Sequence, residues 1–240
     1  MNRVIPLQVS FGSIDNLIFP VILNDDSEMV LIDCGYIGSF ELIKKAAMEV
    51  KVDLSKLTKI IITHHDHDHI GALGEFKKSY PNVKVISSFN EEKYISGREK
   101  SLRLQQAERI FKDIPDDKKE EALKFHEMLQ AVKPVEVDIC VKDKDTFDCC
   151  GGIEIIETPG HMPGHISVYL KESKTLVTGD AMVAESGKLC IANPQYTLDI
   201  EEARKSIEKF LQYDIEKIIC YHGGICTERI KESIEQIVSK

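Results

Sequence analysis

The sequence predicts a layered α/β protein. Short apolar runs rich in Val, Ile and Leu alternate with segments of helical spacing along the 240 residues. Several of these runs end in Asp or His close to Gly, at residues 33, 64–69, 180 and 222. Because strand ends meet at one edge in a layered α/β protein, we expect these polar residues to converge. No tract rich in Pro, Gly and Ser interrupts the alternation, so we expect a single domain over residues 1–240.

The first part of the chain is expected to be rich in strands. Strands are predicted at residues 4–9 and 17–23, and a third at 28–32 follows the turn-forming segment 24–27. Helical spacing over 40–50 and an apolar strand over 57–63 come next. Asp33 follows the strand 28–32, close to Gly35. Two roles stay open for it: a turn-forming residue, or a carboxylate that orients a metal-binding histidine.

The segment between residues 90 and 133 differs from the rest of the chain. After a helix over 73–80 and a strand over 83–87, about forty residues are charged and helical in period, with a break at Ile114-Pro115. We therefore expect an inserted helical pair at about 90–133, which in an enzyme would form a lid or a wall of the substrate site. Its arginines, Arg98, Arg103 and Arg109, would meet an anionic substrate there, but for any one of them a solvated helix charge is the simpler interpretation.

The last part of the chain returns to strands. They are predicted at residues 135–141, 146–149, 153–157, 166–170, 175–178 and 216–221, with an irregular stretch at 183–196 and helices at 198–213 and 227–238. The segment from Thr158 to His165 contains two prolines and two glycines, which fix a tight turn. Its histidines, His161 and His165, are four residues apart, a spacing that suits one metal ligand and one supporting hydrogen bond.

Composition limits the function classes. A hydrophobic content of 42% with 30% charged residues is ordinary for a globular protein, and a net charge of −9 argues against binding to nucleic acid. No apolar run is long enough to span a membrane, and the first 22 residues lack the pattern of a signal peptide. The seven cysteines form no C-x-x-C pair and are expected to be reduced. We therefore expect a cytoplasmic protein without a nucleic-acid or membrane partner.

The densest polar cluster is the segment 64–69, which follows the strand 57–63. It holds four of the eight histidines and two aspartates within six residues. A packed core does not absorb so many imidazoles and carboxylates, because each one needs a partner. A structural zinc site normally uses cysteine, and none lies within twenty residues of the cluster. The cluster therefore predicts a catalytic site for zinc, iron or manganese.

Five motifs occur in order along the chain. They are Leu31-Ile32-Asp33-Cys34-Gly35, Ile62-Thr63-His64 through Asp68-His69-Ile70-Gly71, Thr158-Pro159-Gly160-His161 with Gly164-His165, Thr178-Gly179-Asp180, and His222-Gly223. In this order they resemble the metallo-β-lactamase-fold superfamily of metal-dependent hydrolases, over nearly the whole chain. The fold that this resemblance implies is a four-layered αββα sandwich, with two metal ions at the edge between the sheets.

The resemblance also implies a set of metal ligands. One ion would be held by His64, Asp66 and His161, and the second by Asp68, His69 and His222, with Asp180 as the bridge. Asp33 would then support a ligand, His165 would stabilise its turn, and His65 and His67 would be neighbours of the site.

One position departs from the family pattern T-H-x-H-x-D-H. Asp66 stands where the pattern has its second histidine. An alignment that pairs His65 with His67 would put His69 in the aspartate position and break the Asp-His-Ile-Gly match, so we keep the first alignment. A carboxylate at this position is a harder ligand than imidazole and shifts the preference toward iron or manganese.

The activity that the resemblance implies is hydrolysis by a dinuclear site, with zinc as the first choice of metal. The two ions would activate water against a small ester, thioester or lactone, and Asp68 is both a ligand and a candidate to take the proton. Tyr196 would either donate a hydrogen bond to the tetrahedral intermediate or simply pack.

Other classes of protein fit the same residues. A di-iron redox enzyme of the flavodiiron type is favoured by Asp66, a phosphodiesterase shares the resemblance, and a catalytically silent binding module would be expected to have lost a ligand. We expect a small-molecule substrate, and the sequence leaves the oligomeric state open, with a homodimer as one option.

Overall fold

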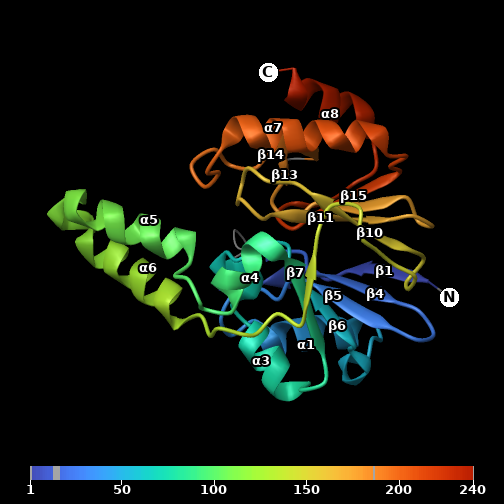
Figure 1. Ribbon diagram of the computed structural model, residues 1–240, viewed down its shortest axis with the longest axis horizontal. Helices are drawn as coiled ribbons and strands as arrows, with labels where there is room; N and C mark the ends of the chain where they lie inside the picture. The colour runs from blue at the N-terminus through green and yellow to red at the C-terminus, as the bar shows by residue number, and fades with distance from the viewer. Residues whose placement is uncertain (1, 13–16, 186, 240) are drawn as a thin grey trace.

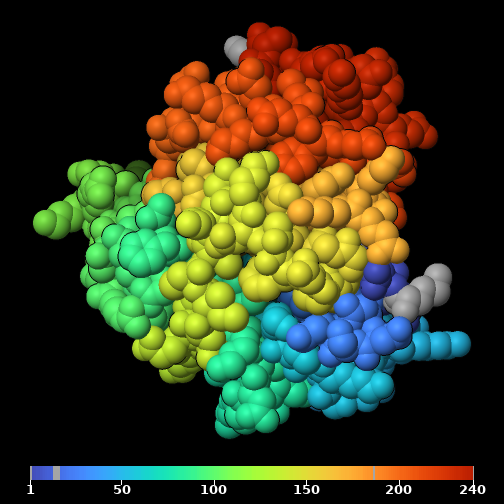
Figure 2. All heavy atoms as spheres, turned by 45° about the vertical axis from the view of Figure 1, so that its right-hand side comes forward, coloured from blue at the N-terminus to red at the C-terminus, as the bar shows by residue number. Residues whose placement is uncertain are grey.

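The computed structural model describes residues 2–12, 17–185 and 187–239 of the chain. Two six-stranded sheets pack face to face, and helices cover the outer face of each (Figure 1). Figure 2 shows the layers from another side, with the N-terminal segments in blue below and the C-terminal helices in red above. The predicted four-layered αββα sandwich is confirmed.

The first sheet has the strand order β1-β4-β5-β6-β7-β8. Its strands are β1 (Arg3–Pro6), β4 (Val21–Asn24), β5 (Met29–Ile32), β6 (Lys59–Ile61), β7 (Lys84–Ser88) and β8 (Ile139–Val141). Strands β1, β4 and β5 are antiparallel, whereas β5 to β8 run in parallel. Because parallel neighbours end at the same edge, the loops that follow β5, β6 and β7 emerge side by side.

The two strands predicted at 4–9 and 17–23 are each broken in two. Strand β1 ends at Pro6, and β2 (Val9–Ser10) pairs with β3 (Leu17–Ile18) as a separate ribbon. Pro20 has no amide hydrogen, so it cannot continue a ladder between β3 and β4. Its carbonyl instead accepts a hydrogen bond from the amide of Leu7 at 2.8 Å, which places the two breaks opposite each other.

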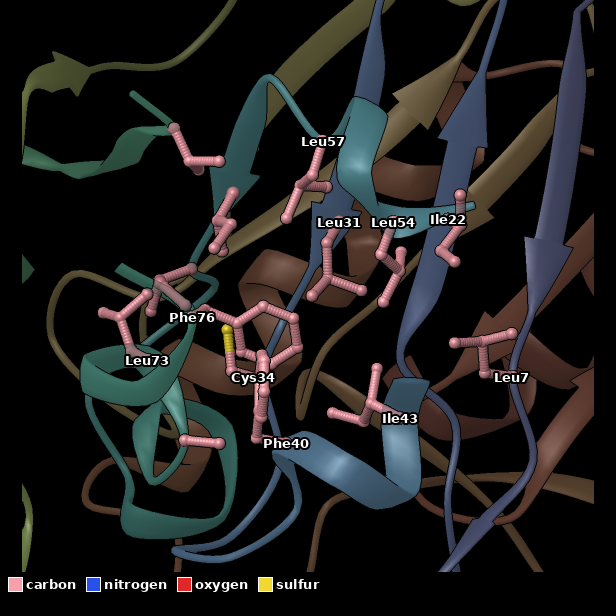
Figure 3. Close-up of a cluster of buried hydrophobic side chains, with 14 of the residues drawn as sticks. Leu7, Ile22, Leu31, Cys34, Phe40, Ile43, Leu54, Leu57, Leu73 and Phe76 are labelled. Carbon is pink, nitrogen blue, oxygen red and sulfur yellow. The ribbon is translucent and has the colours of Figure 1, made fainter. Parts of the chain in front are cut away.

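Helices α1 (Phe40–Glu49) and α3 (Leu73–Ser79) cover the outer face of the first sheet. Phe40 and Phe76 meet edge to face between them, with ring centroids 4.9 Å apart, and Figure 3 shows both rings beside Leu31 of β5. Burial of one such side chain contributes about 1.5–3 kcal/mol. Helix α3 follows the histidine-rich segment directly, so this packing also fixes that segment on the sheet.

The second sheet has the order β16-β15-β12-β11-β10-β9. Its strands are β9 (Thr146–Phe147), β10 (Ile153–Glu157), β11 (Ile166–Leu170), β12 (Thr175–Val177), β15 (Lys217–Cys220) and β16 (Gly224–Cys226). One face packs on the first sheet, where Ile155 and Val168 join Ile32 and Ile61 in the central core. Helices α7 (Ile200–Glu208) and α8 (Ile230–Val238) cover its other face.

The segment predicted as an inserted helical pair contains three α-helices. Helix α4 (Phe89–Ile95) packs beside β7, and α5 (Leu102–Ile110) and α6 (Lys119–Ala131) form an arm that projects from the sandwich (Figure 1). The short 3-10 helices η3 (Phe111–Asp113) and η4 (Asp116–Lys118) join α5 to α6. The arm has its own small core of Leu104, Ala107 and Leu129. In the described part of the chain, the arm included, no helix is both long and apolar enough to cross a membrane.

The segment predicted to be irregular, 183–196, is partly regular. Strands β13 (Met182–Glu185) and β14 (Lys188–Ile191) form an antiparallel hairpin. The interpretation was wrong because the hairpin is short and its apolar residues do not alternate strictly; Met182 and Leu189 are held by packing against the α7–α8 layer. The hairpin lies next to the loop after β15, where the carbonyl of His222 accepts a hydrogen bond from the amide of Ala184 at 3.0 Å.

Several other elements are also shorter than predicted. The strand expected at 135–141 begins only at Ile139, because the carboxylate of Asp138 accepts the amide hydrogen of Val85 at 2.9 Å, in place of a backbone carbonyl. The helix expected at 198–213 is α-helical from Ile200 to Glu208 and continues as the 3-10 helix η5 (Lys209–Gln212). The helix expected at 227–238 starts at Ile230, after Arg229 in the left-handed region with φ 49°.

Gly71 is expected to be required for the fold. A Cβ at this position would lie 2.3 Å from the amide nitrogen of Ile37 and 2.4 Å from the carbonyl carbon of Tyr36. Backbone atoms cannot move aside cheaply, so we expect Gly71→Ala to lower the free energy of unfolding by about 2–3 kcal/mol. Chemical denaturation measures this value.

Gly74→Ala is the matched control, three residues further on in α3. Its Cβ would meet the side chains of Lys133 at 3.0 Å and Val135 at 4.0 Å rather than backbone, and alanine favours a helix. We expect its stability to stay within about 1 kcal/mol of the wild type. Equal stabilities for the two variants would contradict the close approach at Gly71.

Candidate metal centre

The segment 64–69 lies at the edge of the first sheet, directly after β6. Helix α2 (His67–Ile70) begins there, and the carbonyl of Asp66 accepts the amide hydrogen of His69 at 2.9 Å. This single turn of helix sends Asp68 and His69 toward the site from successive positions. His64 and His69 are completely buried, and Asp66 is 5% exposed. The sequence-predicted cluster is therefore part of the interior rather than a solvated run.

Three more loops bring the remaining predicted ligands to the same place. His161 follows β10, Asp180 follows β12, and His222 follows β15. Ligand atoms of three groups lie within 4.8 Å of one another: His64, Asp66 and His161; Asp68, His69 and His222; and His64, His69 and Asp180. The structure thus brings together all seven residues that the sequence predicted as ligands.

Asp180 lies between the two halves of the cluster. Its Oδ1 is 3.4 Å from Nε2 of His69, and its Oδ2 is 3.7 Å from Nε2 of both His161 and His222. Burial raises the pKa of Asp180, but His222 and His69 lower it by more, so the pKa lies well below its usual range. The carboxylate is therefore ionised. It faces both the group of His64, Asp66 and His161 and the group of Asp68, His69 and His222.

The polar atoms of the cluster fit a bound metal. Among the described residues of the cluster, Nε2 of His64, Nε2 of His69 and Oδ1 of Asp180 are buried without a hydrogen-bond partner. Leaving such atoms unpaired costs about 1–3 kcal/mol each. Imidazole nitrogens and carboxylate oxygens are the donors that divalent transition metals prefer. The residues present therefore suit divalent cations.

Asp33 and Thr63 fix which nitrogen of the histidines faces the cluster. Oδ2 of Asp33 accepts hydrogen bonds from Nδ1 of His69 at 2.9 Å and from Oγ1 of Thr63 at 2.8 Å. Because the Thr63 hydroxyl donates to Asp33, it accepts from Nδ1 of His64 at 3.1 Å. Both rings then turn Nε2 toward the site, the nitrogen that would bind a metal ion. Of the two roles left open for Asp33, the structure supports the orientation of a histidine.

His165 supports the loop that carries Asp180. Its Nε2 accepts the amide hydrogen of Asp180 at 3.0 Å, and its Nδ1 lies 2.8 Å from the hydroxyl of Thr158. Burial lowers the pKa of His165 well below its ordinary value, which keeps the ring neutral. The second histidine of the turn therefore has the supporting role expected for it.

Glu91 is a buried residue of this region that sequence reasoning missed. Its carboxylate accepts hydrogen bonds from the amide and the ring of His65 and, at 2.9 Å, from the amide of Gly164. It thereby joins the loop of His64 to the loop of His161. The sequence signal was the pair Ser88 and Glu91, typical of a capping box. Ser88 does cap α4, but the side chain of Glu91 turns to the loop that carries His64 and His65 instead.

Arg103 corrects the interpretation of the arginines as solvated helix charges. Its side chain is 6% exposed and pairs with Asp66, with Nη2 at 2.7 Å from Oδ2. Arg98 fits the interpretation better, since it is 58% exposed and pairs with Glu92 and Glu136. Arg109 is exposed as expected. Nothing in the local pattern distinguishes the three, because the partner of Arg103 is 37 residues away in sequence.

A cavity of about 470 Å³ opens over the cluster. The core sandwich supplies the polar side chains of its floor, the arm supplies Phe125 and Arg103, and the segment after β12 supplies Val183 and Tyr196. The side chains of Asp68 and His222 are 12% and 33% exposed. The ring of Tyr196 is half exposed at the rim and does not pack in a core, which leaves it accessible from the cavity.

Comparison with known proteins identifies the family. The model of the metallo-beta-lactamase superfamily matches residues 18–222. The chain is 27% identical to the uncharacterized protein YobT of Bacillus subtilis over 91% of both chains, and 27% identical to the probable metallo-hydrolase YflN of the same organism over 88% of this chain and 81% of that one. The fold matches the crystal structure of a metallo-beta-lactamase family protein, TTHA1429 of Thermus thermophilus, with a TM-score of 0.76 at 19% identity, over 98% of this chain and 78% of the other. The chain therefore belongs to the metallo-beta-lactamase superfamily and is a metal-dependent hydrolase.

Proposed function

We propose that the enzyme uses two divalent metal ions, zinc by preference, to hydrolyse a small ester, thioester or lactone. His64, Asp66 and His161 would hold one ion, Asp68, His69 and His222 the other, and Asp180 would bridge them. The observation that carries the proposal is the position of Asp180, whose two oxygens face the histidines of both triplets at 3.4–3.7 Å. One carboxylate with two such faces is suited to bridging a pair of cations.

The chemistry that a bound pair of divalent ions supplies is a lower pKa for water and polarisation of the scissile carbonyl. The protein residues keep the donors in place: Asp33 orients His69, and the hydroxyl of Tyr221 donates to the carbonyl of Asp68 at 2.6 Å. Asp68 is a carboxylate that faces the cavity, with Oδ2 at 3.1 Å from Nε2 of His222. It is our candidate to take a proton during the reaction.

The cavity supports an uncharged carbonyl substrate over a phosphodiester. Among the described residues that line it, Arg103 is the one Lys or Arg, and its guanidinium is already paired with Asp66. A phosphate group would find no free cation of the protein there. The apolar side chains of Val183, Ala184 and Phe125 suit the carbon skeleton of a small ester, thioester or lactone.

We also propose that the enzyme works in the cytoplasm, without a nucleic-acid or membrane partner. The net charge of −9 disfavours binding to nucleic acid. The seven cysteines are free thiols, which fits a reducing compartment. A homodimer remains one option for the assembly, and sedimentation of the purified protein decides it.

His69→Ala is expected to abolish hydrolysis. The change removes a completely buried ligand that contacts Asp33 and Asp180, so turnover should fall by more than about 100-fold and the metal content should drop. Metal analysis and a panel of esters, thioesters, lactones and phosphodiesters on the same preparation measure both effects.

His126→Ala is the matched control for this change. His126 lies on α6 and pairs with Glu108 of the arm. Neither residue is one of the proposed ligands. It should keep wild-type metal content and turnover. Full metal content and full turnover in His69→Ala would refute the dinuclear assignment.

The competing di-iron redox function rests on the carboxylate of Asp66. Protein purified without added zinc should contain little iron and should consume no oxygen with a reductant, because the charge of Asp66 is offset by Arg103. Metal analysis beside an oxygen electrode checks this. Two irons per chain with reductant-dependent oxygen consumption, in a preparation inactive on the hydrolase panel, would favour the redox enzyme instead.

A further inference from the structure

Arg103 is a buried cation that reaches the metal centre from the arm. It lies in the first turn of α5, and its Nη2 and Nε contact the two carboxylate oxygens of Asp66 at 2.7 and 3.3 Å. Such a two-pronged pair fixes the plane of the carboxylate as well as its position.

Two further N–H groups of Arg103 are also engaged within the protein. Nη2 donates to the carbonyl of Tyr196 at 2.9 Å, and Nη1 donates to Oε1 of Gln106 at 3.0 Å. A guanidinium has five N–H groups, so four of them have partners in the described structure. The side chain is therefore committed to its neighbours and is poorly placed to receive an anionic substrate.

Both oxygens of Asp66 contact the guanidinium, and one of them, Oδ2, also faces the metal centre. Oδ1 accepts from Nε of Arg103 at 3.3 Å, whereas Oδ2 accepts from Nη2 at 2.7 Å and also lies 3.2 Å from Nε2 of His161 and 3.7 Å from Nε2 of His64. Rotation of the carboxylate would break the contact with the guanidinium. Arg103 thus holds Asp66 in the orientation in which Oδ2 points at both histidines.

Charge gives a second reason for the pair. Asp66 carries a negative charge where the family pattern has a neutral histidine, and the positive charge of Arg103 offsets it at contact distance. Both groups are buried, so each would be costly alone. The pair therefore replaces a neutral ligand without changing the net charge of the site.

We propose that Arg103 is a positioning residue of the first metal site, and that Asp66 and Arg103 act as one unit in place of the family's second histidine. The inference rests on the assignment of Asp66 as a ligand in the proposed function. It predicts that a histidine at position 66 is not tolerated while Arg103 is present. An imidazole nitrogen there would face the N–H groups of the guanidinium, which would compete with the metal for its lone pair.

The experiment is a double-mutant cycle of wild type, Arg103→Gln, Asp66→His and Asp66→His/Arg103→Gln. Each full-length protein is stripped of metal and titrated with zinc against a competing chelator, and with cobalt(II), whose visible spectrum reports the coordination of each site. Each single variant should bind the ion at the first site, that of His64, Asp66 and His161, about 10–100-fold more weakly than the wild type does. The double variant should recover to within about threefold of the wild type, a strong departure from additivity.

Two further variants make the test decisive. Arg109→Gln changes an exposed arginine of the same helix and should bind both ions as the wild type does. If Arg103→Gln does not fold, as judged by circular dichroism, Arg103→Lys takes its place. Lysine keeps the charge without the two-pronged contact to Asp66, so metal affinity at the first site should still fall by about tenfold.

The results separate the inference from the function on which it rests. A wild-type protein that binds no metal overturns the dinuclear site, and the inference with it. A wild-type protein with two ions, whose Arg103→Gln variant binds them equally well or more tightly, overturns the inference alone, because it shows that the guanidinium does not position the ligand. A double variant that binds the first-site ion no more tightly than the weaker-binding single variant overturns the inference that Asp66 and Arg103 act as one unit.

Discussion

The structure depends on the concentration of buried charge at one edge of the two sheets. Asp66, Asp68 and Asp180 lie together with four imidazoles in a region where the side chains are at most one-third exposed. Burial disfavours each ionised carboxylate, and hydrogen bonds and nearby positive charge offset this cost. The loops after β6, β10, β12 and β15 must therefore meet closely, or each loop would leave isolated polar groups inside the protein.

Supporting contacts from the sandwich fix the geometry of these loops. Asp33 sets the orientation of His69, His165 holds the amide of Asp180, and Glu91 joins the loop of His65 to the turn at Gly164. Each contact joins segments that are distant in sequence. The cluster of candidate ligands is thus a property of the packed sheets, because no single segment holds more than four of its seven members.

The arm takes part in the site instead of only covering it. Its main core is small, and it is connected to the sandwich at the metal loop by Arg103 and by the amide of Leu102, which donates to Nε2 of His65 at 3.2 Å. An arm with few apolar contacts of its own depends on such polar contacts for its position. The same contacts place Phe125 at the cavity, so the wall of the cavity and the metal loop are held by one set of interactions.

The sequence by itself determined the sandwich and identified the residues of the polar cluster, because apolar strands that end in Asp or His, in the order of a known family, are local patterns. Strand ends were less well determined, as the breaks at Pro20 and Asp138 and the hairpin at residues 182–191 show. The tertiary structure alone decided the roles of Glu91 and Arg103. A capping glutamate and a helix arginine look the same in sequence whether they face solvent or a buried ligand, since their partners lie 26 and 37 residues away and are brought near only by the packing of the arm and α4 on the sheet.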